Sequence, residues 1–152
     1  MPPRRDGMSR PRTDDELLEA LVGTWRVTGQ MRGQPLAQSW SASRALGGKF
    51  VEIRVTNGTP LIDGKPYEAT YFIGATDGRF VLTLMDVFGA AYAAVPGLGR
   101  RDGDTIVFEF AYATGPLTWR WSLGDGSWEH EQTYAENGER KVFATKRAER
   151  IG

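Results

Sequence analysis

The sequence predicts an all-β fold: a closed antiparallel up-and-down β-barrel of about ten strands with one short N-terminal helix. Three observations support this prediction. From Gly23 onward apolar residues recur with a period of two, turn-forming residues interrupt the pattern roughly every ten positions, and no second helical period follows. Because a twisted sheet of this many strands would leave unpaired edges if it stayed open, we expect it to close.

The composition limits the classes of function. The 152 residues fit one domain with a sizeable core, and 19 basic residues balance 19 acidic ones, so no nucleic-acid partner is expected. The absence of cysteine excludes disulfides, thiolate chemistry and sulfur-dependent zinc sites. The N-terminal arginines precede no apolar segment, so we expect no signal peptide, no membrane anchor and a cytoplasmic protein.

The N-terminal region divides into a leader and a helix. Residues 1–12 hold three prolines and four arginines, so they are expected to be a flexible leader to a single barrel domain at 13–152. Thr13 and Glu16 have the spacing of a capping box and predict a helix over 14–22. Its apolar face should cover one end of the barrel and consists of Leu17, Leu18, Leu21 and Val22.

Ten segments are predicted as strands because apolar and polar residues alternate along them between short turns such as TDG, GDG and ENGE. Trp25 should close one barrel end, and Gly47 with Gly48 should form a tight connection. The predicted strands are residues 24–31, 37–46, 49–57, 67–75, 79–86, 90–95, 104–112, 117–124, 127–134 and 140–148.

Alternation also predicts which side chains face the interior. Large apolar residues fall on one face of segments 104–112 and 117–124, and that face should point inward. The same reasoning in segment 127–134 directs Trp128, His130, Gln132 and Tyr134 inward, and Ser127, Glu129, Glu131 and Thr133 toward solvent. His130, the only histidine, is therefore expected beside aromatic rings inside the barrel.

Four motifs occur in a recognisable order: LVGTWRVTG at 21–29, ALGGKFVEIRV at 45–55, YFIGATDGRFVLTLMDVFG at 71–89 and KVFATKR at 141–147. Together they resemble a bacterial lipocalin-like family of unassigned function, over roughly residues 17–147. The resemblance implies an up-and-down calycin barrel. It implies no particular activity, so function has to be argued from the site.

The chain is also distantly similar to nitrobindin, which opens with a comparable G-T-W and binds haem through a histidine near the start of its last strand. Here the final strand places Arg140 or its neighbours at that position, and His130 lies one strand earlier. With one histidine and no cysteine, we expect no haem, no transition metal and no other cofactor.

Asp86 ends an otherwise apolar strand in register with Phe80, Leu82 and Leu84, and should point inward. A buried carboxylate requires a partner, for which Arg44 and Arg54 are the candidates. Two interpretations stay open: a structural ion pair at the barrel mouth, or a group that orients a ligand.

The aromatic supply predicts a cavity for one small, largely apolar or aromatic ligand. The small side chains of Ala90, Ala91, Ala93 and Ala94 should leave space inside, although they also fit an outer face packed on a second subunit, so a homodimer stays open. The predicted ligand-binding residues are Arg44, Arg54, Tyr71, Asp86, Tyr92, Phe110, Tyr112, Trp119, Trp121, Trp128, His130 and Tyr134.

Two functions remain open from the sequence. The first is a small-molecule binding protein, which needs only an apolar cavity and a few convergent polar groups. The alternative is a cofactor-free isomerase, cyclase or lyase, in which His130 would be the general acid or base and Asp86 or Tyr134 would orient it or the substrate. The sequence contains no nucleophile and base at a recognisable spacing, which favours binding.

Overall fold

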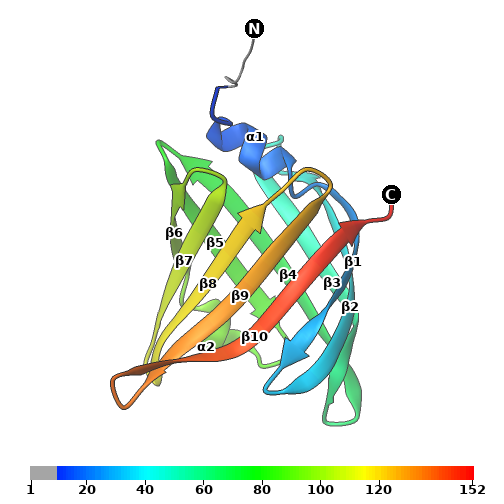
Figure 1. Ribbon diagram of the computed structural model, residues 1–152, viewed down its shortest axis with the longest axis vertical. Coiled ribbons are helices and arrows are strands. Elements are labelled where there is room, and N and C mark those ends of the chain that lie inside the picture. Colours follow the sequence, from blue (N-terminus) through cyan, green and yellow to red (C-terminus); the bar gives the residue numbers. More distant parts are fainter. Residues whose placement is uncertain (1–9) are drawn as a thin grey trace, which may run out of the picture.

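Short turns determine the architecture, because a two-residue turn forces the strands on either side of it to pair. The computed structural model describes residues 10–152. Ten strands form the predicted closed antiparallel barrel, in which each strand pairs with the next and β10 pairs with β1 (Figure 1). They are β1 (Gly23–Met31), β2 (Gln34–Ala45), β3 (Phe50–Ile62), β4 (Lys65–Thr76), β5 (Arg79–Asp86), β6 (Gly97–Asp102), β7 (Thr105–Tyr112), β8 (Gly115–Leu123), β9 (Ser127–Glu136) and β10 (Glu139–Arg150).

One predicted strand, 90–95, is wrong. Its first four residues form the short helix α2 (Ala90–Ala93), and the sixth strand follows at Gly97–Asp102. Alanine favours the helical conformation, and Pro96 separates α2 from β6. Most of the alanines near α2 are exposed, so they do not enlarge the interior as the sequence suggested.

The glycines of β6 explain why the sequence of this strand resembles that of a turn. Gly97 and Gly99 are buried and face the interior, where a Cβ atom would lie 2.6 Å from the Phe110 ring and 2.7 Å from the Phe108 ring. Both glycines therefore make room for large side chains of the neighbouring strand β7, and they are there for packing.

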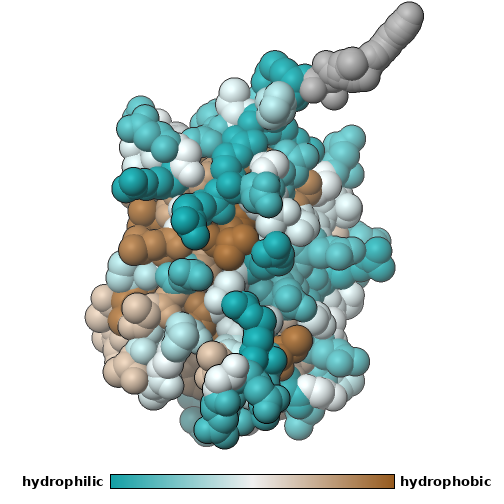
Figure 2. Space-filling view, turned by 60° about the vertical axis from the view of Figure 1, so that its left-hand side comes forward, coloured by the Kyte–Doolittle hydropathy of each residue, from teal (hydrophilic) through white to brown (hydrophobic). Residues whose placement is uncertain are grey.

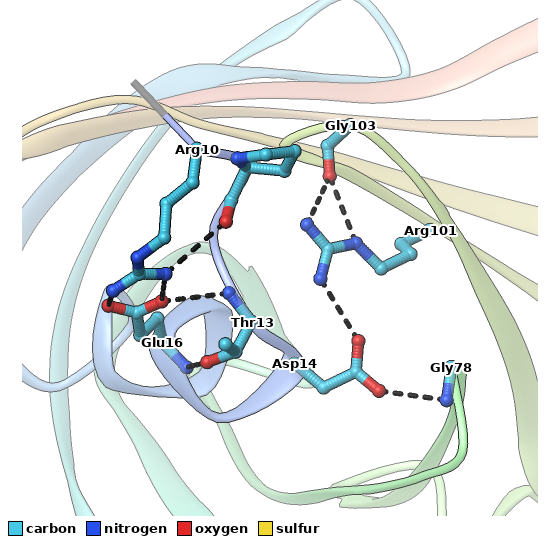
Figure 3. A network of polar contacts seen from close by, with 8 residues as sticks. Arg10, Thr13, Asp14, Glu16, Gly78, Arg101 and Gly103 are labelled. Atoms are coloured by element: carbon cyan, nitrogen blue, oxygen red, sulfur yellow. Dashed lines mark hydrogen bonds and ion pairs between the residues drawn. The ribbon is translucent and has the colours of Figure 1, made fainter. Parts of the chain in front are cut away.

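Helix α1 (Asp14–Glu19) begins where the capping box predicted, since Thr13 Oγ1 accepts from the Glu16 amide at 3.1 Å and Glu16 Oε1 accepts from the Thr13 amide at 2.9 Å. Asp14 fastens the helix to the rim of the barrel. Its carboxylate accepts from the Gly78 amide at 2.8 Å and from Arg101 Nη1 at 3.0 Å (Figure 3). The helix ends earlier than the predicted residue 22.

The predicted leader, 1–12, falls largely outside the described residues. Its last residues contact the folded domain: Arg10 Nη1 donates to Glu16 Oε1 at 2.7 Å, and Arg12 Nη2 donates to the Gly124 carbonyl at 3.1 Å. Among residues 10–152, no helix has the length and apolar character needed to cross a membrane.

The end of the barrel beneath α1 is densely filled. Leu17, Leu18 and Leu21 of the helix region are buried there together with Trp25. The Trp25 indole donates to the Leu21 carbonyl at 2.8 Å and lies 5.9 Å from the Trp128 ring. Trp25 therefore closes this end as predicted, and it joins the helix to the strands.

The outer surface is mostly polar but carries apolar side chains on one side of the barrel (Figure 2). Val81 of β5 and Leu98 of β6 are cross-strand partners, and both are exposed, as is Met85 further along β5. These residues point away from the interior, so they take no part in the cavity described below.

Candidate functional site

A cavity of about 610 Å³ opens at the end of the barrel opposite α1. The turn after β1, helix α2, the turn between β7 and β8 and the start of β10 surround its mouth. Apolar and aromatic side chains form most of its wall, including Leu84, Phe88, Tyr92, Tyr112, Leu117 and Trp119. The polar side chains on the wall include those of Tyr67, Asp86, Gln132, Tyr134 and Lys146, and Arg32 lies at the mouth in the turn after β1.

Asp86 lines the cavity, as its position in the strand predicted, but its partners are not arginines. One carboxylate oxygen accepts from the Tyr67 hydroxyl at 2.8 Å, and the other accepts from the Phe88 amide at 2.9 Å. Burial raises the pKa of Tyr67 well above its usual value, with Tyr71 and Asp86 adding to the effect. The Tyr67 hydroxyl therefore stays protonated at neutral pH and donates a hydrogen bond to Asp86.

The expectation that Arg44 or Arg54 would pair with Asp86 is wrong. Arg44 lies under α1, where its guanidinium is 3.1 Å from Asp15 and 3.1 Å from Glu19, at the opposite end of the barrel. Arg54 alternates with buried Ile53 and therefore points outward. It pairs with Glu52 at 2.8 Å. Neither arginine belongs to the cavity.

Lys146 of β10 forms part of the deep wall of the cavity, and the sequence had not singled it out. The side chain is 4% exposed. Its Nζ donates to Gln38 Oε1 at 3.3 Å and lies 5.1 Å from the centre of the Trp40 ring. Burial lowers the pKa of Lys146 to about 7, although the charge of Asp86 acts in the opposite direction.

A β-bulge turns Lys146 inward. The hairpin turn at Asn137 and Gly138 pairs Lys141 with Tyr134, but beyond the bulge between Val142 and Ala144 the register shifts by one residue. Lys146 then lies directly opposite His130, and residues directly opposite each other share a face of the sheet. Had the register of the turn continued, Thr145 would occupy that position and Lys146 would face solvent.

His130 points into the barrel, as alternation predicted, and is 2% exposed. Its Nε2 is 3.0 Å from Gln132 Nε2, which donates to it when the imidazole carries its proton on Nδ1. Burial, with Lys146 as a second cause, lowers the pKa of His130 well below its usual value. The cavity wall includes Gln132 but not His130.

Several buried N–H and O–H groups of the interior find no partner among residues 10–152. Trp119 Nε1 and the Tyr112 hydroxyl belong to residues of the cavity wall. Gln38 Nε2 belongs to the residue that accepts from Lys146. Several hydrogen-bonding groups in and around the cavity wall are therefore unsatisfied among the described residues.

The remaining predicted ligand-binding residues divide into two groups. Tyr92, from α2, and Tyr134 lie on the cavity wall. The other group is buried in the aromatic core outside that wall, and consists of Tyr71, Phe110, Trp121 and Trp128.

Thr133 departs from the prediction that it faces solvent. It is 5% exposed, and its hydroxyl accepts from Arg140 Nη1 at 2.8 Å. The long Arg140 side chain covers Thr133, so Thr133 points outward but is not exposed to solvent.

A second hollow, of about 450 Å³, lies on the outer face of β8, β9, β10 and β1, and is wide open to solvent. Its charged side chains, such as Arg120, Glu129 and Arg147, point outward and alternate in sign. His130 and Lys146 border it only from behind, because both side chains point inward. The enclosed, largely apolar cavity is therefore the better candidate site.

Within residues 10–152, no three His, Asp or Glu side chains gather in a way that could hold a metal ion. The chain matches no protein-family model, and it matches no curated protein.

Proposed function

We propose that this barrel is a binding protein for one small, largely apolar or aromatic molecule, held in the cavity opposite α1. The observation that carries the proposal is the composition of the cavity wall: mainly aromatic and aliphatic side chains, with a few polar groups among them, surround about 610 Å³. Volume and lining of this kind are typical of sites for small organic ligands, which span roughly 300–1,000 Å³.

The two ends of the barrel support a single route of entry. Leucines and tryptophans fill the end beneath α1, whereas the cavity mouth is surrounded by turns and by the four-residue helix α2. A ligand would enter past Phe88 and Tyr92, which are both partly exposed. Their rings would then cover its apolar surface.

The placement of His130 argues against the alternative, an acid–base enzyme. A general acid or base must come within hydrogen-bonding reach of the substrate, and His130 is buried outside the cavity wall and bonded to Gln132. Asp86 and Tyr134 do lie on the wall, but Asp86 is occupied by Tyr67 and by the Phe88 amide. Binding is therefore the function that this geometry supports best.

A fluorescence titration with the neutral apolar probe N-phenyl-1-naphthylamine tests the proposal. Trp119 on the cavity wall should transfer excitation energy to a probe bound there. Leu117→Trp would fill the cavity and should weaken binding about tenfold or more, because the probe and the new indole compete for one volume. Leu98→Trp adds the same side chain on the outer face and should change nothing.

Two results would contradict the proposal. One is that the wild-type protein binds no probe even at high probe concentration. The other is equal weakening by Leu117→Trp and Leu98→Trp, which would place the probe on the outer surface.

A further inference from the structure

We propose that the ligand of this cavity is an apolar or aromatic monocarboxylic acid, whose carboxylate binds Lys146 at the deep end while its apolar part extends toward α2. This inference rests on the proposed function and specifies the chemical class of the ligand. Its basis is a buried lysine on the cavity wall that forms no ion pair with the described residues, and a wall that is otherwise largely apolar and aromatic.

The cation has no counter-ion inside the barrel. Lys146 takes part in none of the ion pairs among residues 10–152, and its one hydrogen bond goes to a neutral amide, that of Gln38. The Trp40 ring provides only a weak cation–π contact. A buried ammonium group is unfavourable without a paired charge, so a bound anion would stabilise the charged form of Lys146.

The neighbouring polar groups also require an acceptor. Gln38 Oε1 already accepts from both Lys146 and the Trp40 indole, and Gln38 Nε2 has no partner among residues 10–152. Trp119 of β8 lines the same cavity as Lys146, and its indole N–H likewise has no partner among the described residues. A carboxylate has about four acceptor positions and no donor, so it complements the ammonium group of Lys146 and can accept from a further N–H group.

The other interior carboxylate does not replace the ligand. Asp86 lies on the same wall, but its two oxygens accept from Tyr67 and from the Phe88 amide. Its negative charge would also disfavour an anionic group beside it, and so would direct the carboxylate of a ligand to Lys146 and the apolar part toward the mouth. The charges of the cavity therefore favour one orientation of the ligand.

Binding of an acid should depend on pH because Lys146 must be protonated to pair with it. The charged and titratable groups that act on Lys146 are His130 on β9 and Asp86 on β5, whereas its contacts on β2, Gln38 and Trp40, are neutral. The pKa of Lys146 in the empty protein is about 7, and a bound carboxylate would raise it. Affinity should therefore be highest between about pH 5 and 7, and fall as the pH rises further.

The experiment compares matched probes by isothermal titration calorimetry. 2-Naphthoate and decanoate are the acids, and 2-naphthylmethanol and decan-1-ol are the neutral compounds of the same shape. At pH 6.5 wild-type protein should bind each acid about tenfold or more tightly than its alcohol. Lys146→Met should abolish that preference and keep the alcohol affinity, whereas Arg147→Met, on the outside of the same strand, should change neither.

A second measurement needs no substitution of Lys146. Titrating the acid into wild-type protein at pH 7.5, in phosphate and in Tris, gives the number of protons taken up, expected to exceed about half a proton per acid bound. Trp119→Phe removes the indole N–H together with part of the ring, so it should weaken acid binding a few-fold more than alcohol binding. If Lys146→Met failed to fold, these two results would decide the inference.

The outcomes separate the inference from the proposed function. Equal affinity for acid and alcohol, binding of acid without proton uptake, or an acid preference that survives Lys146→Met would overturn the inference and leave the binding function standing. Failure of all four probes to bind wild-type protein would overturn the binding function and the inference with it.

Discussion

The two ends of this barrel are built from the same strands but are filled differently. Beneath α1, buried leucines pack with Trp25, whose indole donates to the Leu21 carbonyl, and Asp14 accepts from Gly78 and Arg101. At the open end, Trp119 and Tyr112 line a cavity of about 610 Å³. The closed end is therefore a packed core, and the open end has space for a ligand.

This difference indicates where stability and binding are located. Fully packed aromatic groups stabilise a fold through burial and dispersion, whereas a cavity forfeits those contacts until a ligand supplies them. Substitutions at the closed end should thus affect unfolding, and substitutions at the open end should affect binding. The predictions below test that division, in order of decreasing effect.

The largest effect is expected from Trp25→Ala at the closed end. The ring is 1% exposed, contacts Trp128 and lies 4.6 Å from the guanidinium of Arg150, so truncation leaves a large void and an unpaired Leu21 carbonyl. We expect the free energy of unfolding to fall by about 3–5 kcal/mol, measured by urea denaturation. Leu117→Ala on the cavity wall should lower it by only about 1 kcal/mol. Equal losses would contradict the division between the ends.

A somewhat smaller effect is expected from the pH dependence of Lys146. Its pKa is near 10.5 in the unfolded chain and about 7 in the folded protein, so between these values the unfolded chain binds more protons. Stability therefore rises with pH across this window, by about 5 kcal/mol in total and by about 3 kcal/mol between pH 7 and 9.5. Lys146→Met should lack this rise and be the more stable protein at pH 7.

The measurement is a series of urea denaturations of both proteins from pH 7 to pH 9.5. The upper limit of pH 9.5 lies below the usual tyrosine pKa of 10, so most tyrosines of the unfolded chain stay neutral. In the folded protein, burial raises the pKa of Tyr71 and of Tyr112 above that value, so a higher pH would add a second source of pH dependence. Parallel curves for the two proteins would show that Lys146 is not desolvated in the folded state.

The barrel itself could be predicted from the sequence because its signals are local. Alternation and turn residues define each hairpin, and Thr13 with Glu16 define the start of α1. The strand at 90–95 could not be assigned correctly, because Gly97 and Gly99 look like turn residues in the sequence. Only the rings of Phe108 and Phe110 on the next strand explain these glycines.

The cavity could be predicted in kind but only partly in its residues. Asp86, Tyr92, Tyr112, Trp119 and Tyr134 are on the wall as predicted. The deep lysine was missed for a physical reason: a one-residue bulge reverses which side chains face inward, and nothing in the composition of KVFATKR shows where the bulge lies. Arg44 was misplaced because alternation gives the face of a strand but not the end of the barrel at which a side chain lies, and Arg54 points outward.

The smallest predicted effect concerns the cap of α1. Thr13→Ala removes the hydroxyl that accepts from the Glu16 amide, and should lower the free energy of unfolding by about 1 kcal/mol. The loss should be that small because Asp14 and the buried leucines still hold the helix to the barrel. Thr114→Ala, an exposed threonine at the open end, is the matched control and should change stability by less than about 0.5 kcal/mol. If the two variants lose the same stability, or if Thr13→Ala weakens probe binding in the distant cavity, then α1 is not an independent closure of one end and the two ends of the barrel are coupled.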